Sequence, residues 1–181
     1  MRIAVIGPQN TGKSTFIKDF LEEFPHYSTP ENTYRTVIES KALDVNQKTG
    51  LESQKEIRDF MFGELRHNEK YNVIFDRCLI DNYVYTYVQY EKGDIPKWFV
   101  EETESMMTDL LSKVDMYIFI PTAVSVPLVD DGTRDITASY IDQVNNQFLK
   151  ILFELIRKYQ ITVKVISGSR KERIKEMKKL I

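Results

Sequence analysis

The chain has 181 residues, of which 42% are hydrophobic, 29% charged and 12% aromatic, as expected of a globular chain of about one domain. Lysine and arginine total 25 against 27 aspartates and glutamates, so the net charge gives no case for a nucleic-acid-binding or membrane-surface protein. One cysteine, Cys78, and two histidines exclude an internal disulfide and a zinc site of the usual His/Cys spacing. No apolar run approaches the length of a membrane span or a signal peptide. We expect no membrane contact and a cytoplasmic location, in a cell or a virus-infected cell.

Strand-like and helix-like segments alternate along the chain. Five short runs have the composition of β-strands: residues 2–6, 26–29, 73–76, 116–121 and 161–167. Segments of helical length separate them, which is typical of a parallel sheet with helices on both faces. The sequence therefore predicts an α/β fold in three layers, with a five-stranded parallel sheet flanked by helices. No repeat or flexible linker interrupts it, so we expect residues 1–181 to form a single domain.

Several patterns locate the helices. Capping boxes at residues 49–52 and 169–172 predict two helix starts, the first helix ending near Asn68. The tyrosine-rich segment 83–90 fits a strand or one face of a helix, and we interpret it as a helix. Apolar residues at steps of three and four predict a long amphipathic helix over residues 141–159. The last two helices therefore bury one face each against the sheet.

The strongest motif lies near the N-terminus. Residues 7–14, Gly-Pro-Gln-Asn-Thr-Gly-Lys-Ser, match G-x-x-x-x-G-K-[ST] between the first predicted strand and a predicted helix over residues 15–24, which is typical of a phosphate-binding loop, or P-loop. Its glycines let backbone amides face a polyphosphate, Lys13 bridges the terminal phosphates, and the Ser14 hydroxyl ligates magnesium. We therefore expect ATP and Mg2+ as cofactors. The residues expected to contact them are Gly7, Asn10, Thr11, Gly12, Lys13, Ser14 and Thr15.

A charged pair ends the third predicted strand. Asp76 and Arg77 follow the apolar run directly, at the edge where open α/β sheets bind ligands. Asp76 is a candidate magnesium ligand together with Ser14, and Arg77 is a candidate to grip an anionic or hydroxyl group of a substrate. The alternative is an ion pair at a strand end with no ligand.

With these motifs, the chain resembles the P-loop kinases of nucleosides and nucleotides, a group that includes thymidylate kinase, deoxynucleoside kinases and nicotinamide riboside kinase. In segment 29–35, the resemblance implies Glu31 as the catalytic base and Arg35 as a substrate contact. Asp76 is the alternative base, and Glu31 is otherwise a carboxylate in a first helical turn. The resemblance further implies that Gln54 contacts the substrate base and that Asp81 belongs to the substrate site.

Two more loops resemble parts of these kinases. Residues 125–140 are similar to a short lid, from which Arg134 would reach the transferred phosphoryl group. Its alternative is a polar turn in which Arg134 pairs with neighbouring acids. The loop that ends in Arg170 is similar to the one that packs the adenine ring. Alternatively, Ser169 simply caps the final helix.

The combined prediction is an ATP-dependent kinase that transfers the γ-phosphoryl group to a hydroxyl of a nucleoside- or nucleotide-like acceptor. Lys13, Asp76 or Glu31, Arg77 and Arg134 would carry the chemistry. A first alternative is a viral-type kinase of hydroxymethylated pyrimidines in DNA, with tyrosines of segment 83–90 and Trp98 lining a channel. A second is a regulatory P-loop ATPase or switch that acts through a partner. A homodimer is compatible with each of these.

Overall fold

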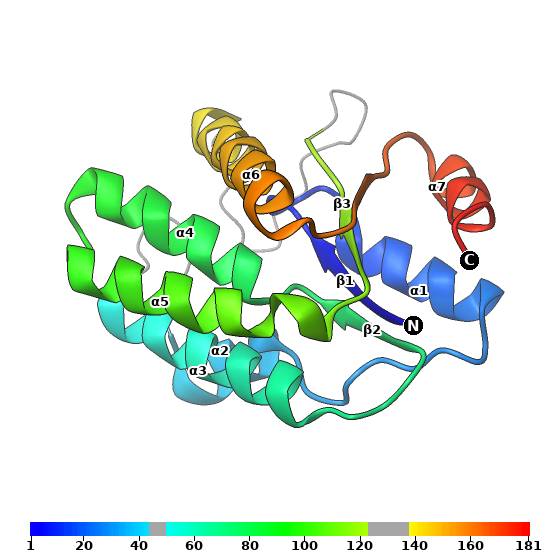
Figure 1. Cartoon of the computed structure of the whole chain (residues 1–181), viewed down its shortest axis with the longest axis horizontal. Coiled ribbons are helices and arrows are strands. Elements are labelled where there is room, and N and C mark those ends of the chain that lie inside the picture. The colour runs from blue at the N-terminus through cyan, green and yellow to red at the C-terminus, as the bar shows by residue number, and fades with distance from the viewer. Residues whose placement is uncertain (44–49, 123–137) are drawn as a thin grey trace.

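The computed structural model describes residues 1–43, 50–122 and 138–181. Its elements are β1 (Arg2–Ile6), α1 (Lys13–Glu23), α2 (Tyr34–Lys41), α3 (Leu51–His67), β2 (Val73–Asp76), α4 (Leu79–Lys92), α5 (Lys97–Leu110), a 3-10 turn η2 (Leu111–Lys113), β3 (Met116–Phe119), α6 (Ala138–Tyr159), β4 (Val163–Val165) and α7 (Arg170–Met177). Strands and helices alternate as the sequence predicts (Figure 1).

The sheet is parallel, with strand order β2-β1-β3-β4. In its register, Val5 of β1 lies opposite Asp76 of β2. The predicted α/β fold is confirmed, but the predicted strand at residues 26–29 is wrong. There, Ser28 forms a single parallel bridge to Val73, because this polar segment exposes most of its residues and leaves the sheet edge after one pairing. The described sheet therefore has four strands.

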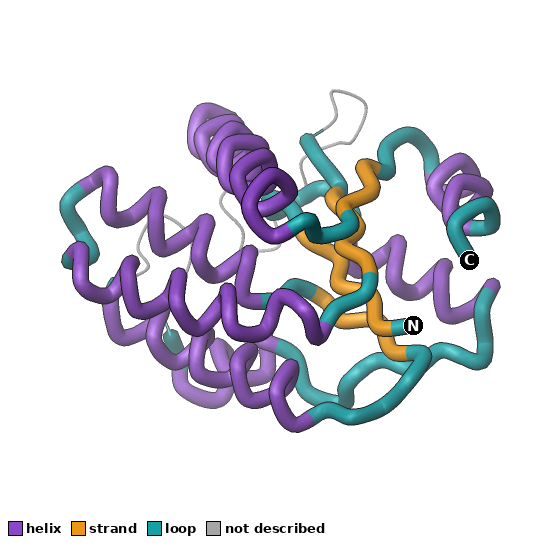
Figure 2. The backbone as a smooth tube through the Cα atoms, in the orientation of Figure 1, coloured by secondary structure: helices purple, strands orange, loops and turns teal. Residues whose placement is uncertain are grey.

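Helices cover both faces of the sheet. Figures 1 and 2 show α1 and α7 on one side and α3, α4, α5 and α6 on the other. Successive residues of a strand face opposite sides: in β1, Ile3 and Val5 join the core beneath α1, whereas Ala4 and Ile6 join the larger core beneath the other helices. This two-sided burial is the reason that β1, β2 and β3 are largely apolar, whereas β4 at the sheet edge contains Lys164 and is mostly exposed.

The helix predictions are largely confirmed. Segment 83–90 lies within α4, and α6 buries the predicted stripe except at its end, where Tyr159 is 38% exposed. Ser169 caps α7 as predicted, since its side chain accepts a hydrogen bond from the Glu172 amide. The helix predicted to start at a capping box instead begins at Leu51 with Gly50 as its N-cap and no side-chain cap. Thr49 lies outside the described residues.

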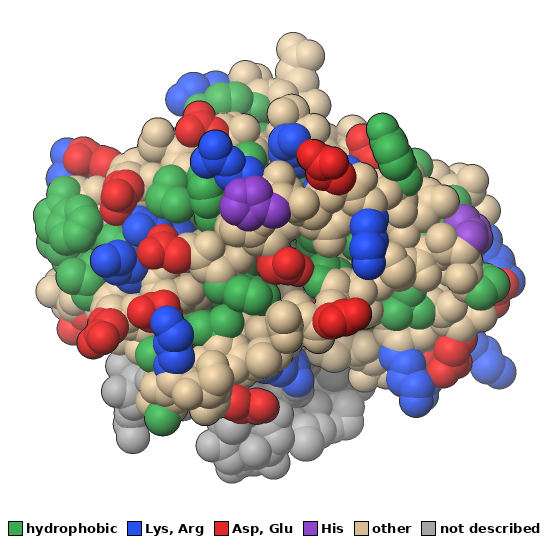
Figure 3. Space-filling view, turned by 90° about the horizontal axis from the view of Figure 1, so that it is seen from below, with side chains coloured by type: hydrophobic (Ala, Val, Ile, Leu, Met, Phe, Trp, Pro, Cys, Tyr) green, Lys and Arg blue, Asp and Glu red, His purple; other side chains and the backbone are tan. Residues whose placement is uncertain are grey.

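Surface charge is mixed. On the face shown in Figure 3, basic and acidic side chains alternate instead of gathering by sign. Across the described residues, no helix combines the length and the apolar character that crossing a bilayer requires.

Candidate active site

The P-loop follows β1 in a conformation that requires glycine at two positions. Gly7 has φ 139°, and a Cβ atom there would lie 2.4 Å from the carbonyl oxygen of Ile120. Gly12 has φ 79° and is the N-cap of α1. The loop is therefore pressed against the end of the β3 segment and leads directly into a helix N-terminus, where backbone amides and the helix dipole favour anions.

Lys13 lies across this loop. Its Nζ donates hydrogen bonds to the carbonyl oxygens of Gly7, at 2.8 Å, and of Pro8, and to Thr11 Oγ1 at 3.3 Å. Thr11 Oγ1 donates in turn to the Pro8 carbonyl oxygen at 3.1 Å. Both side chains are buried. The ammonium group is therefore positioned by the loop itself and can exchange these carbonyl contacts for phosphate oxygens.

Asp76 and Ser14 face each other between β2 and α1. Ser14 Oγ donates to Asp76 Oδ2 at 3.2 Å and accepts from Arg35 Nη2 at 3.1 Å. The second carboxylate oxygen, Asp76 Oδ1, is buried and has no hydrogen-bond partner within the described ranges. A carboxylate beside a hydroxyl supplies the hard oxygen ligands that Mg2+ prefers. Ser14 and Asp76 thus fit the magnesium site that the sequence predicts.

Arg77 turns away from Asp76 and under the P-loop. Its backbone has φ 72°, and its Nη1 donates to Asp81 Oδ1 at 2.8 Å and to the Gly7 carbonyl oxygen at 3.2 Å. Asp81 also accepts from the amides of Gly7 and Cys78, each at 3.2 Å. Asp81 is 1% exposed; burial raises its pKa, and the Arg77 charge opposes that rise. The structure therefore places Asp81 behind the loop, where it supports the Gly7 amide.

Two tyrosines enclose the Arg77 guanidinium, which lies 5.0 Å from the ring centre of Tyr34 and 5.3 Å from that of Tyr85. Burial disfavours its charge, but the surrounding tyrosine and carboxylate oxygens outweigh burial and raise the pKa of Arg77 well above its usual value. The Tyr85 hydroxyl also donates to Gln9 Oε1 at 2.5 Å, so α4 holds the P-loop at a second point. The sequence analysis considered Tyr85 only as part of segment 83–90 and assigned neither tyrosine to Arg77, because no motif indicates this contact.

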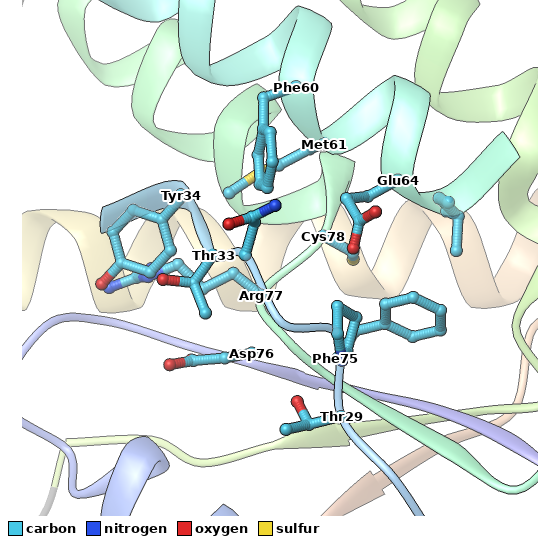
Figure 4. A pocket seen from close by; sticks show the side chains of 13 residues that line it. Thr29, Thr33, Tyr34, Phe60, Met61, Glu64, Phe75, Asp76, Arg77 and Cys78 are labelled. Atoms are coloured by element: carbon cyan, nitrogen blue, oxygen red, sulfur yellow. The ribbon is translucent and has the colours of Figure 1, made fainter. Parts of the chain in front are cut away.

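A pocket opens beside Asp76 and Arg77, with a volume of about 400 Å³ when its open mouth is included. Figure 4 shows Phe60, Met61 and Glu64 reaching into it from α3, above Phe75 of β2. Its remaining lining residues are Thr29, Pro30, Asn32, Thr33, Tyr34, Leu65 and Cys78. The pocket is therefore largely apolar, with a few charged groups, which is the usual composition of a small-molecule site.

The candidate base Glu31 and the predicted substrate residues Arg35, Gln54 and Asp81 all lie outside this lining. Glu31 is exposed and precedes α2, which begins at Tyr34 after the N-cap Thr33. The alternative that placed Glu31 in a first helical turn is therefore wrong, and its role as the base stays a prediction. Gln54 is 4% exposed, and its Oε1 accepts from Asn82 Nδ2 at 2.7 Å, so it joins α3 to α4. Its contact with a substrate base also stays a prediction.

Two arginines of α7 differ in their placement. Arg170 extends over the surface, its side chain 67% exposed, and donates to both carboxylate oxygens of Asp19 in α1, at 2.8 and 2.5 Å. Arg173 is 5% exposed and donates to the carbonyl oxygens of Thr11 at 2.8 Å and Gly168 at 3.0 Å; burial lowers its pKa. The sequence analysis selected Arg170 and missed Arg173. Arg173 lies four residues before Met177, a spacing that places both residues on the same face of α7 and could have indicated burial of Arg173.

The structure describes only part of the predicted lid, residues 125–140. Arg134 lies outside the described residues, and residues 138–140 of the proposed lid form the first turn of α6. The role of Arg134 stays a prediction.

Comparison with known proteins places the chain in a family. A family model described as an AAA domain matches residues 2–173. The chain belongs to this AAA domain family. A search of curated proteins gives no match for this AAA domain.

Solved structures show which fold this AAA domain shares. A deoxyadenosine kinase from M. mycoides with the products dCMP and dCDP aligns with TM-score 0.75 and 20% identity, over 99% of this chain and 98% of that one. NadR in complex with NR aligns with TM-score 0.68 and 17% identity, over 96% and 49%. Thymidylate kinase from Candida albicans aligns with TM-score 0.66 and 16% identity, over 99% and 89%. The predicted resemblance to P-loop nucleoside and nucleotide kinases is confirmed at the level of the fold.

Proposed function

We propose that this AAA domain is a kinase that transfers the γ-phosphoryl group of ATP to a hydroxyl of a nucleoside- or nucleotide-like acceptor. One observation carries the proposal: Asp76 hydrogen-bonds to Ser14 of the P-loop helix and also lines the pocket. One carboxylate thus joins a site suited to a triphosphate and a site suited to a small organic molecule. A phosphoryl transferase must bring these two ligands into contact.

In the donor half of the site, the side chains of Lys13 and Arg35 would exchange their present contacts when ligands bind. The amides of residues 7–14 and the start of α1 would hold the triphosphate, and Lys13 would bind its terminal oxygens. Ser14 and Asp76 would hold Mg2+, which, when bound, neutralises charge on the phosphate oxygens. Arg35 donates to the same Ser14 Oγ, so this contact would give way when Mg2+ binds to that oxygen.

The acceptor half contains a base and a fixed cation. Asp76 Oδ1 has no hydrogen-bond partner in the described part of the chain, and it would accept the proton as the acceptor oxygen attacks the γ-phosphorus and ADP leaves. Arg77 is held by Asp81 and Gly7, so it would act as a preorganised positive charge near the reacting groups. Glu31 lies outside the pocket lining, which favours Asp76 as the base.

The structural neighbours support an acceptor of nucleoside type: the deoxyadenosine kinase holds dCMP and dCDP, and NadR holds NR. The alternative acceptor, a pyrimidine in DNA, gains no comparable support. Tyr83 is buried in the core, Trp98 is 56% exposed on α5, and neither lines the described pocket. That alternative and the regulatory ATPase stay predictions.

The test measures ADP formation and phosphoryl transfer with Mg2+, ATP and a panel of nucleosides and nucleotides. We expect turnover that depends on an acceptor and is lost in Lys13→Ala, because the buried ammonium is the P-loop cation. Lys18→Ala is the matched control, since Lys18 is an exposed lysine of the same helix. Turnover that needs no acceptor would instead support an ATPase, and transfer that survives in Lys13→Ala would refute the proposed site.

A further inference from the structure

The pocket contains a carboxylate that the proposed chemistry does not use. Glu64 projects from α3, and its side chain makes no hydrogen bond or ion pair anywhere in residues 1–43, 50–122 and 138–181, while its Oε2 atom is buried. A buried oxygen without a donor costs free energy that a hydrogen bond would recover. Because almost all such groups have partners in folded proteins, the missing donor points to a ligand.

The surroundings of Glu64 indicate the shape of that ligand. Phe60, Met61 and Phe75 form apolar walls around the carboxylate, and in the view of Figure 4 Glu64 and Asp76 lie on opposite sides of the labelled group. A flat ring between apolar and aromatic walls is a favourable arrangement. An acceptor whose reacting hydroxyl lies at Asp76 would therefore direct its base towards α3.

We infer that Glu64 reads the base of the acceptor and selects nucleosides that present an amino group, namely those of cytosine, adenine or guanine. This inference rests on the proposed function and names the acceptor class for the same pocket. An ionised carboxylate only accepts hydrogen bonds. The exocyclic amines of these three bases donate them, whereas thymine and uracil present carbonyl oxygens on both sides of their ring N–H. Those oxygens repel a carboxylate.

The decisive variant is Glu64→Gln, which preserves size and supplies both a donor and an acceptor. The ratio of kcat/KM for deoxycytidine to that for thymidine, which share the same sugar, is measured, together with thermal-shift binding of each nucleoside in the absence of ATP. We expect the glutamine to lower this ratio by about tenfold or more, because the hydrogen bond from the amine of deoxycytidine then goes to a neutral amide oxygen, while thymidine gains a hydrogen bond from the amide nitrogen. Glu52→Gln, which alters an exposed carboxylate in the first turn of the same helix, should leave the ratio unchanged.

The outcomes separate this inference from the function on which it rests. An unchanged ratio, or an equal loss for every nucleoside, would overturn base reading and assign Glu64 to the sugar or to stability. A wild-type preference for thymidine would overturn it as well. If the wild type phosphorylates no nucleoside and no nucleotide, the kinase proposal fails; thermal shifts that still favour deoxycytidine, and lose that preference in Glu64→Gln, would support base reading on its own.

Discussion

The P-loop is held from two sides that are built differently. On the side of β2 and α4, Arg77 is a buried cation with a carboxylate partner, Asp81, which also accepts hydrogen bonds from the Gly7 and Cys78 amides. On the side of α7, Arg173 is a buried cation that contacts two carbonyl oxygens, and within the described residues no carboxylate pairs with it. One side is neutralised internally, and the other carries a positive charge.

We infer from this difference that the Arg77 side supports the shape of the P-loop, whereas the Arg173 side contributes to triphosphate binding. The Arg77–Asp81 pair is complete before any nucleotide binds, so loss of Asp81 should act mainly on folding and on the shape of the loop, including the fixed position of Arg77. Carbonyl oxygens compensate the charge of Arg173 only in part, and a bound triphosphate would add the missing negative charge. Variants of the two sides should therefore alter different measured quantities.

The largest effect is expected from Asp81→Ala. Removing this carboxylate leaves the Arg77 guanidinium buried without its partner, which should lower the free energy of unfolding by about 3–5 kcal/mol. Urea unfolding followed by circular dichroism measures this change. Glu91→Ala, which removes an exposed carboxylate of α4, should change it by less than about 0.5 kcal/mol. A loss for Asp81→Ala as small as that of the control would show that the pair does not support the loop.

A smaller and opposite pattern is expected from Arg173→Met. Methionine keeps an apolar side chain and removes a costly buried charge, so stability without ligand should change by only about 1 kcal/mol. The dissociation constant for ATP, measured by calorimetry, should rise by about tenfold or more, because the loop loses a hydrogen bond and a positive charge. Lys175→Met, at an exposed position of the same helix, is the control. A variant that unfolds easily yet binds ATP normally would contradict the assignment of Arg173 to recognition.

The smallest effect is expected from Arg170→Ala, which removes an exposed ion pair. The hydrogen bond from Arg170 lowers the pKa of Asp19, so any stabilisation is present above the pKa of about 4 of an unfolded aspartate and is lost as pH falls through the lower folded value. The melting temperatures of variant and wild type should thus be nearly equal at pH 7 and converge further at pH 3. A large drop in ATP affinity in this variant would instead support the predicted adenine contact.

The sequence predicted the parts of the site that are local. Glycine spacing and a flanking strand define the P-loop, and the polar end of an apolar run locates Asp76. Glu64 and Arg173 were missed because their roles depend on which helix face packs against the loop or the pocket, and that packing involves residues far apart in the chain. The prediction of a strand at residues 26–29 was wrong for a related reason: pairing at a sheet edge depends on the neighbouring strand as much as on the segment itself.

The pairing of Val5 with Asp76 has a consequence for how such a protein can diverge. The donor loop and the acceptor carboxylate leave neighbouring strands, whose spacing of about 4.8 Å is fixed by backbone hydrogen bonds. Substitutions in α2 and α3 can therefore reshape the pocket while the reacting groups keep their separation. Such substitutions would allow related proteins to bind new acceptors while they keep the same reacting groups.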